Sequence, residues 1–366
     1  MSIDYAGSLS RLRARRLGTD RGKVPLNEVL AKVERYQKRS ASDATRYTLG
    51  AMQEVDPDYT RVSNEEAARI EEAVRTGLRA LGRYAEYRQQ GSVPANTHIR
   101  GASDVDLLVL LGEALTYDAA GMRARSGLYM PWAGSVLHAV TQLRADCEGI
   151  LERRYYGATV DKTGSKSIRV SDGSLRRDVD VVPSHWSDNV SYQSSSIERD
   201  RGVCILDRTV PTTSMNLPFL HIARLDEGEA ATAGGLKMAV RLLKNVKADS
   251  SRSIDLSSYD MAGLMWNCER QLLRFQPGRE LSVLLGTDQW LEHLVRNPTF
   301  AGSLVTPDGI RKVLDQPAKF TALATLAAEI AALREAVASE WLTLIKSHTA
   351  NVQDRRVLLE SVTIPG

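Results

Sequence analysis

The chain has 366 residues, of which 43% are hydrophobic and 25% are charged, and its formal net charge at pH 7 is +3. This length is sufficient for two lobes with substantial cores, and the composition is ordinary for a globular enzyme, so no unusual class of protein is needed to account for it. The small net charge argues against an obligate nucleic-acid partner, because any affinity for nucleotides must come from a local basic surface.

The cysteines and the distribution of apolar residues indicate the compartment. Cys147, Cys204 and Cys268 are widely separated and odd in number, which indicates free thiols in a reducing compartment rather than a disulfide framework or a zinc site. No apolar stretch is long enough to cross a bilayer, and no signal-peptide core follows the N-terminal arginines. The sequence therefore predicts a cytoplasmic protein with no membrane partner.

The N-terminal part of the chain is predicted to be helical. Residues 1–62 are polar and rich in arginine, with a helix predicted within residues 26–33 and their continuation. Ser63-Asn64-Glu65-Glu66 has the pattern of a capping box, and apolar residues follow at helical spacing, so a helix is predicted from there to about Arg88. This helix would deliver the chain to a Gly91-Ser92 turn.

The most informative run of the sequence joins the Gly91-Ser92 turn to a strand that carries Asp104 and Asp106. Because side chains alternate along a strand, both acids project from one face, while their neighbours point into a core. Two adjacent like charges repel unless a cation neutralises them, and hard oxygen ligands suit Mg²⁺ or Mn²⁺. In a tight turn, the Ser92 hydroxyl and nearby backbone N–H groups can approach a triphosphate. The run therefore predicts a metal-dependent phosphate site.

Further acids follow on a predicted hairpin. A glycine-broken loop over residues 112–131 and a helix over residues 133–153 precede it. The turn Ser171-Asp172-Gly173-Ser174 contains an Asp-Gly hairpin signal, and Asp178 and Asp180 lie in phase on the second arm. Three in-phase acids on two strands can hold two metal ions, one activating an attacking hydroxyl and one stabilising the leaving pyrophosphate. The set predicts nucleotidyl transfer.

Beyond residue 211 the pattern becomes helical. One predicted helix places Lys237, Arg241 and Lys244 in a narrow sector opposite an apolar face. The pattern alone is equally consistent with a solvated cationic face and with a nucleotide contact. In the next segment Ser258 can bond a phosphate and Tyr259 can stack on a base, although a core role for Tyr259 fits equally well.

The order of these motifs resembles a known family. A Gly-Ser turn, a strand with hydrophobic-Asp-x-Asp-hydrophobic and a later Asp-Val-Val-Pro strand are similar to the polymerase-beta-type nucleotidyltransferases, and the chain is identified as a member of the bacterial CD-NTases. The resemblance implies an α+β, polymerase-beta-type fold. A mixed sheet lobe flanked by helices, with an N-terminal helical extension, would occupy residues 1–210, and a helical lobe over residues 211–366 would close a nucleotide cleft between them.

The resemblance also assigns roles to individual residues. Asp104, Asp106 and Asp180 would be the catalytic acids and the ligands of two Mg²⁺ or Mn²⁺ ions, with Asp180 preferred to Asp178 because it immediately precedes Val-Val-Pro. The nucleotide-binding residues would be Gly91 and Ser92 in the phosphate turn, then Ser258 and Tyr259, and on the basic helix Lys244, with Lys237 in reserve and Arg241 beside them. His98 and Arg100 lie between the turn and the acidic strand, and either a substrate contact or a structural role suits them.

The implied activity is the condensation of ATP or GTP into a cyclic di- or trinucleotide second messenger, with release of pyrophosphate, in bacterial antiphage signalling. Accessory proteins of the CBASS type are implied partners, with conjugation through the C-terminal Gly366 or a frayed tail as the two interpretations of that end. Two alternatives stay open, because the acids would serve linear transfer equally well. They are a linear nucleotidyltransferase that modifies an RNA end, a small molecule or a protein, and a non-catalytic nucleotide sensor.

Overall fold

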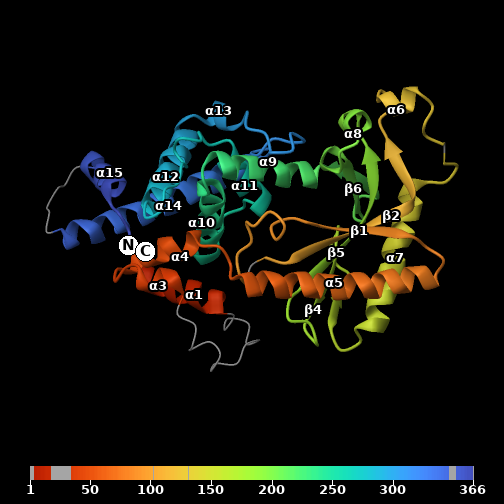
Figure 1. Cartoon of the computed structure of the whole chain (residues 1–366), viewed down its shortest axis with the longest axis horizontal. Helices are drawn as coiled ribbons and strands as arrows, with labels where there is room; N and C mark the ends of the chain where they lie inside the picture. The colour runs from red at the N-terminus through yellow and green to blue at the C-terminus, as the bar shows by residue number, and fades with distance from the viewer. Residues whose placement is uncertain (1–3, 18–33, 102, 131, 346–351, 366) are drawn as a thin grey trace. The chain divides into compact units, whose positions relative to one another are not determined.

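The computed structural model describes residues 4–17, 34–101, 103–130, 132–345 and 352–365 (Figure 1). Two compact units make up the chain. The sheet unit comprises residues 56–95 and 103–223, and the helical unit comprises residues 1–55, 96–102 and 224–366. The predicted helix at residues 26–33 lies outside the described residues.

The described part of the sheet unit contains one seven-stranded mixed sheet. Its strands are β1 (Ala85–Gln90), β2 (Val105–Tyr117), β3 (Thr159–Asp161), β4 (Ile168–Ser171), β5 (Val179–Asp188), β6 (Gly202–Asp207) and β7 (Thr212–Asn216). The strand order is β1-β2-β5-β4-β3, with β6 pairing with β5 and β7 with β6. β2 and β5 run parallel and the other pairs are antiparallel, which confirms the expected mixed sheet.

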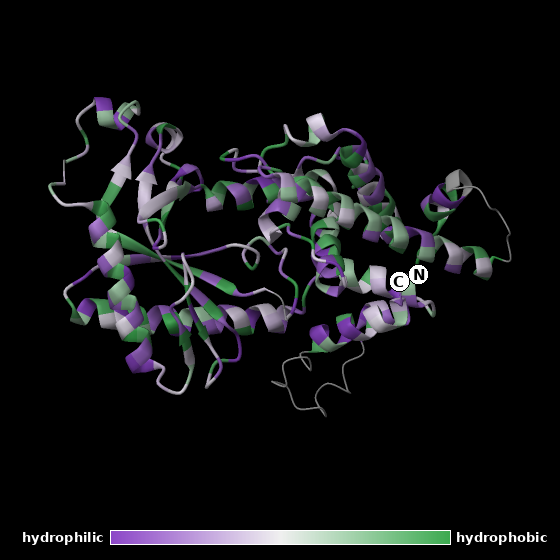
Figure 2. Ribbon diagram, turned by 180° about the vertical axis from the view of Figure 1, so that it is seen from behind, coloured by the Kyte–Doolittle hydropathy of each residue, from purple (hydrophilic) through white to green (hydrophobic). Residues whose placement is uncertain are grey.

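Helices α5 (Pro57–Ala80) and α7 (Val136–Arg154) cover one face of this sheet (Figure 1). Their apolar residues, such as Ile70 and Leu143, join Leu107 and Val109 of β2 in a buried core. The other face of β2 carries Leu108 into a second core with Trp186. Hydrophobic residues are accordingly concentrated along the central strands (Figure 2). Alternation therefore holds along β2, and it sets the direction of the acids at its start.

Short elements complete the sheet unit, and longer helices form the helical unit. The short elements are α6 (Met122–Arg125), α8 (Val190–Ser195) and a 3₁₀ turn at Glu198–Asp200. The remaining helices are α1 (Tyr5–Leu17), α3 (Arg35–Lys38), α4 (Asp43–Met52), α9 (Pro218–Ala231), α10 (Gly235–Asp249), α11 (Ser258–Trp266), α12 (Glu280–Arg296), α13 (Pro298–Ala301), α14 (Pro317–Leu344) and α15 (Val352–Ser361). Within the described ranges, no helix combines the length and apolar composition of a membrane span.

The structure differs from the expected boundary at residue 210. Residues 1–55 and 96–102 group with the C-terminal helices and not with the sheet. The physical reason is a set of contacts from α1 to α10: the Arg15 guanidinium donates to the Asp249 carboxylate at 2.7 Å and to Asn245 at 3.1 Å. A bidentate guanidinium of this kind positions two helices precisely.

The prediction of a helix over residues 63–88 was wrong at both ends. Helix α5 begins earlier, because the Asp56 side chain accepts from the Asp58 backbone N–H at 2.8 Å with Pro57 at the first helical position. Ser63 lies inside the helix, with its hydroxyl on the Tyr59 carbonyl. The helix ends at Ala80, and Gly82 follows at a φ of +73°. The loop predicted from residue 112 was also wrong at its start, because β2 continues to Tyr117.

Candidate active site

The predicted acids converge at the start of two parallel strands. Asp106 is paired with Asp180 in the register between β2 and β5. Asp104 and Asp178 occupy the equivalent positions just before each strand, and the Val105 backbone N–H donates to the Asp178 carbonyl at 3.4 Å. The predicted hairpin between β4 and β5 is also present, with positive φ at both residues of its Asp-Gly turn. Strand alternation together with the parallel pairing of β2 and β5 therefore brings four carboxylates to one end of the sheet.

Arg169 on β4 is a member of this cluster that sequence reasoning missed. It pairs with Asp180 in the antiparallel register. Its guanidinium contacts one carboxylate oxygen of Asp104 and one of Asp178, each at 2.8 Å. The available signal was strand phase, because a predicted hairpin with Asp180 on one arm places a residue of the opposite arm beside it on the same face.

Asp180 carries the least satisfied carboxylate of the cluster. Its Oδ1 is buried and has no hydrogen-bond partner among the described residues. Burial, and next the neighbouring charge of Asp104, raise the pKa of Asp180 to about 6, although Arg169 acts in the opposite direction. A cation beside Asp180 would lower this pKa and supply the missing partner.

The Gly91-Ser92 turn lies very close to the Asp106 carboxylate. Gly91 has a φ of +81°, and a Cβ at this position would lie 2.2 Å from Oδ2 of Asp106. Only glycine permits both the backbone conformation and this approach. Ser92 is half-buried beside it, and its hydroxyl makes no hydrogen bond within the part of the chain that the structure describes. A ligand held at this turn would therefore lie against the acids.

The donor set fits Mg²⁺ or Mn²⁺, which prefer carboxylate oxygens. The buried, unpartnered Asp180 Oδ1 and the close approach of Gly91 to Asp106 support this fit. Among the described residues, however, no three Asp, Glu, His or Cys side chains form a group that is arranged to hold a metal ion. Asp104 is instead engaged by Arg169.

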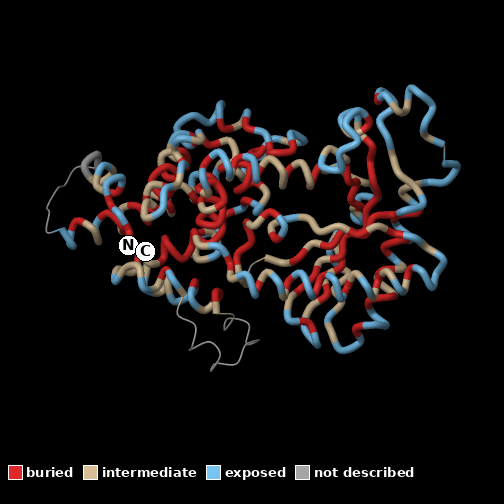
Figure 3. The backbone as a smooth tube through the Cα atoms, viewed as in Figure 1, coloured by how far each residue is buried: buried red, intermediate tan, exposed pale blue. Residues whose placement is uncertain are grey.

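The basic residues of α10 are not on a solvated face. Lys237, Arg241 and Lys244 are 7%, 2% and 4% exposed, and the helix is buried over most of its length (Figure 3). Lys237 Nζ contacts the Asp226 carboxylate at 2.5 Å. Burial lowers the pKa of Arg241 to about 10, while the Glu54 and Glu229 charges oppose this shift. The solvated-face interpretation of this helix is therefore wrong.

Two of these cations hold the segment that leads to the acids. Arg241 donates to the Met52 carbonyl and to the Asn96 carbonyl, both at 2.8 Å. Lys244 Nζ donates to the Thr97 carbonyl at 2.9 Å. Residues 96–102 connect the Gly91-Ser92 turn to Asp104. Helix α10 therefore holds the segment of chain that lies between these two parts of the predicted site.

Lys244→Met is expected to lower the free energy of unfolding by about 1–3 kcal/mol, because it leaves the buried Thr97 carbonyl without this donor. The Michaelis constant for a nucleoside triphosphate should change by less than about twofold if this contact is the role of Lys244. Denaturant unfolding and steady-state kinetics measure the two quantities. Lys247→Met is the matched control, since Lys247 lies on the same helix and donates to the carbonyl of Leu256, a residue beyond the end of that helix. A tenfold rise in the Michaelis constant with normal stability would instead support the predicted triphosphate contact.

The Ser258-Tyr259 pair begins α11. Ser257 is the N-cap and forms a capping box with Asp260, so Ser258 is exposed at the first helical position. The Tyr259 hydroxyl donates to the Asp308 carboxylate at 2.5 Å, and the Arg311 guanidinium lies 5.1 Å from the centre of its ring. Burial and the Asp308 carboxylate raise the pKa of Tyr259. These contacts give Tyr259 a structural role, and its stacking on a base stays a prediction.

The remaining candidates are placed as follows. His98 is 1% exposed, which favours a structural role for it. The Arg100 guanidinium donates to the carbonyls of Arg16 and Leu17, and so joins residue 100 to α1. Gly366 lies outside the described residues.

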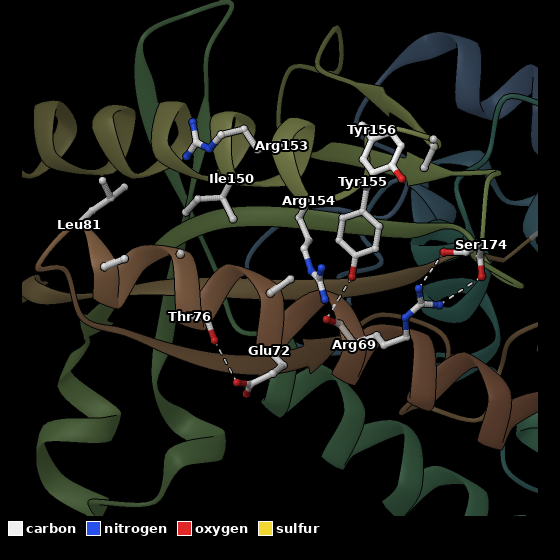
Figure 4. Close-up of a pocket in the computed structure, with 15 residues that line it drawn as sticks. Arg69, Glu72, Thr76, Leu81, Ile150, Arg153, Arg154, Tyr155, Tyr156 and Ser174 are labelled. Carbon is white, nitrogen blue, oxygen red and sulfur yellow. Dashed lines mark hydrogen bonds between the residues drawn. The ribbon is translucent and has the colours of Figure 1, made fainter.

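A cavity of about 910 Å³ lies between α5 and α7, away from the acids (Figure 4). In it the Arg69 guanidinium donates to the Ser174 hydroxyl at 2.8 Å, and the Tyr155 hydroxyl donates to the Arg69 carbonyl at 3.2 Å. None of the predicted site residues lines this cavity. It therefore does not belong to the acid cluster.

Comparison with known proteins places this chain in a nucleotidyltransferase family. Residues 223–337 match the cGAS/DncV-like nucleotidyltransferase C-terminal helical domain. A cyclic dinucleotide synthase CdnE from Yersinia aleksiciae is 41% identical over 296 residues, which cover 80% of this chain and 76% of the relative. A c-di-GMP synthase from Lachnospiraceae bacterium strain RUG226 is 30% identical, covering 73% of this chain and 80% of the relative.

A solved structure shows the same fold. The STING-associated CdnE c-di-GMP synthase from Capnocytophaga granulosa aligns with a TM-score of 0.71 at 27% identity, covering 90% of this chain and 97% of that one. The α+β fold of a nucleotidyltransferase with a C-terminal helical domain is thereby confirmed. The chain belongs to the CD-NTase family of cGAS/DncV-like nucleotidyltransferases.

Proposed function

We propose that this protein condenses nucleoside triphosphates into a cyclic dinucleotide and releases pyrophosphate. The observation that carries the proposal is the pairing of Asp106 with Asp180 at the ends of two parallel strands, directly against the Gly91 turn. The relatives named as cyclic dinucleotide and c-di-GMP synthases support the cyclic product. The c-di-GMP synthases make GTP the first substrate to test, with ATP second.

Each group of site residues has its own role in the proposed reaction. Gly91 and Ser92 would hold the triphosphate, because the turn brings backbone N–H groups and a hydroxyl against the acids. Asp104, Asp106 and Asp180 would hold two Mg²⁺ or Mn²⁺ ions. When bound, these ions would lower the pKa of the attacking ribose hydroxyl and neutralise charge on the phosphates. Asp180 would orient the attacking hydroxyl, since its free carboxylate oxygen is the buried acceptor of the site.

The product would serve as a second messenger. The Capnocytophaga granulosa enzyme is described as STING-associated, which supports a signalling role in bacteria. An antiphage function and CBASS-type accessory proteins extend this proposal, and loss of phage protection in cells that carry an inactive variant of the gene would test them.

The decisive experiment is incubation of the purified full chain with all four nucleoside triphosphates and Mg²⁺ or Mn²⁺. Phosphatase treatment and mass spectrometry then identify what survives. A phosphatase-resistant cyclic dinucleotide that is absent from the Asp104→Asn, Asp106→Asn double variant would establish the synthase. Asp172→Asn is the matched control, since it makes the same change at an exposed hairpin turn that has a φ of +63°.

Two results would contradict the proposal. A linear product or a nucleotidylated RNA, small molecule or protein would identify a linear nucleotidyltransferase. Nucleotide binding with no turnover under any metal condition would favour the sensor.

A further inference from the structure

The acidic end of the sheet contains a protein cation among its carboxylates, the Arg169 guanidinium. The Arg169 side chain lies between Asp104 and Asp178, with one 2.8 Å contact to each carboxylate. It is the strand neighbour of Asp180. Three of the four acids at this end of the sheet are thus in contact with, or adjacent to, one guanidinium.

The two carboxylates that Arg169 contacts differ in exposure to solvent. The Asp178 side chain is 8% exposed, whereas the Asp104 side chain is 24% exposed. Breaking the contact to Asp178 would take a cation from a carboxylate that is largely away from water, while the more exposed Asp104 carboxylate can exchange its partner at lower cost. Arg169 is therefore anchored at Asp178 and exchangeable at Asp104.

A guanidinium and a divalent cation cannot share Asp104 without cost. The Arg169 contact occupies Oδ2 of Asp104, and its positive charge repels a second cation placed at the same carboxylate. Among the described residues the acids do not form a group that is arranged to hold a metal, although their oxygens suit one, and Asp104 is the acid that Arg169 engages.

We propose that Arg169 is a positioning residue that competes with the divalent cation for Asp104, and that Asp178 anchors Arg169 and is not a metal ligand. The inference rests on the proposed function, which assigns the metal to Asp104, Asp106 and Asp180. Without the metal, Arg169 prevents repulsion between the acids. With the metal, Asp104 exchanges its partner while Asp178 retains Arg169.

Mn²⁺ binding to the full chain without nucleotide tests the inference, measured by electron paramagnetic resonance or titration calorimetry. Arg169→Gln is expected to bind Mn²⁺ about fivefold more tightly than the wild type, because the competing charge is gone. Arg169→Lys keeps the charge and should stay within about twofold of the wild type. A residue with a merely structural role would give weaker or unchanged binding when removed.

Arg169→Gln leaves the buried Asp178 without this partner, which can destabilise the fold. A second variant therefore separates loss of stability from the effect on metal binding. Arg169→Gln, Asp178→Asn removes both partners of this ion pair together, so that no buried carboxylate loses its guanidinium. This double variant should also bind Mn²⁺ more tightly than the wild type. Asp178→Asn alone should keep saturable Mn²⁺ binding, whereas Asp180→Asn should lose it. Equal loss in both single variants would overturn the assignment of Asp178.

The outcomes separate this inference from the proposed function. If the wild type shows no saturable Mn²⁺ binding, or if Asp180→Asn does not weaken it, the proposed metal site fails and the inference fails with it. If the wild type binds and Asp180→Asn does not, the metal site stands. In that case, unchanged or weaker binding by both Arg169→Gln and its Asp178→Asn double variant overturns the competition alone.

Discussion

Asp180→Asn is expected to reduce cyclic product formation by about a thousandfold or more, because it removes one of the three carboxylates that would hold the catalytic ions. The side chain keeps its shape, so the packing of β5 against β2 should be preserved. Initial rates of pyrophosphate release at saturating nucleoside triphosphate measure the effect.

The same substitution should not destabilise the protein in EDTA. The wild-type Oδ1 is buried without a hydrogen-bond partner among the described residues, and burial together with the Asp104 charge disfavours the ionised carboxylate, so a neutral side chain removes that unfavourable charge. We therefore expect a melting temperature in EDTA equal to or above that of the wild type. Asp172→Asn is the control for the Asp-to-Asn change and should alter neither quantity. Retained activity, or lost stability together with lost activity, would contradict the role given to Asp180.

Gly91→Ala is expected to lower activity by about a hundredfold or more, because its Cβ would lie 2.2 Å from Oδ2 of Asp106 and one of the two must move. The φ of +81° adds a backbone cost of about 1–2 kcal/mol for any L-residue. Turnover and thermal unfolding measured on the same preparation separate the catalytic effect from the loss of stability.

Gly82→Ala provides the matched control for this prediction. Gly82 has a similar φ of +73°, but a Cβ there would meet nothing within 4 Å. Gly82→Ala should lower the free energy of unfolding by an amount comparable to the backbone cost in Gly91→Ala, and it should leave turnover unchanged. If the two variants lost turnover equally, backbone strain would explain the loss, and the contact between Gly91 and Asp106 would have no catalytic importance.

The sequence by itself determined the local geometry of the acids. Strand alternation placed Asp104 and Asp106 in phase, the Asp-Gly turn placed Asp180 on a hairpin, and the Gly91-Ser92 turn preceded both. These features depend on neighbours within a few residues, because side-chain direction in a strand has a period of two. The family resemblance drew on the same local motifs and was confirmed.

Only the tertiary structure decided which charges meet. Helical periodicity showed that Lys237, Arg241 and Lys244 share a sector, but the Asn96 and Thr97 carbonyls that bury Arg241 and Lys244 lie about 145 residues away in the chain. The same holds for Arg169 and Asp104, which different strands bring together. The partner of a charged group is set by long-range packing, and the free energy of burying the group depends on that partner, so periodicity alone could not tell a solvated cation from a buried structural one.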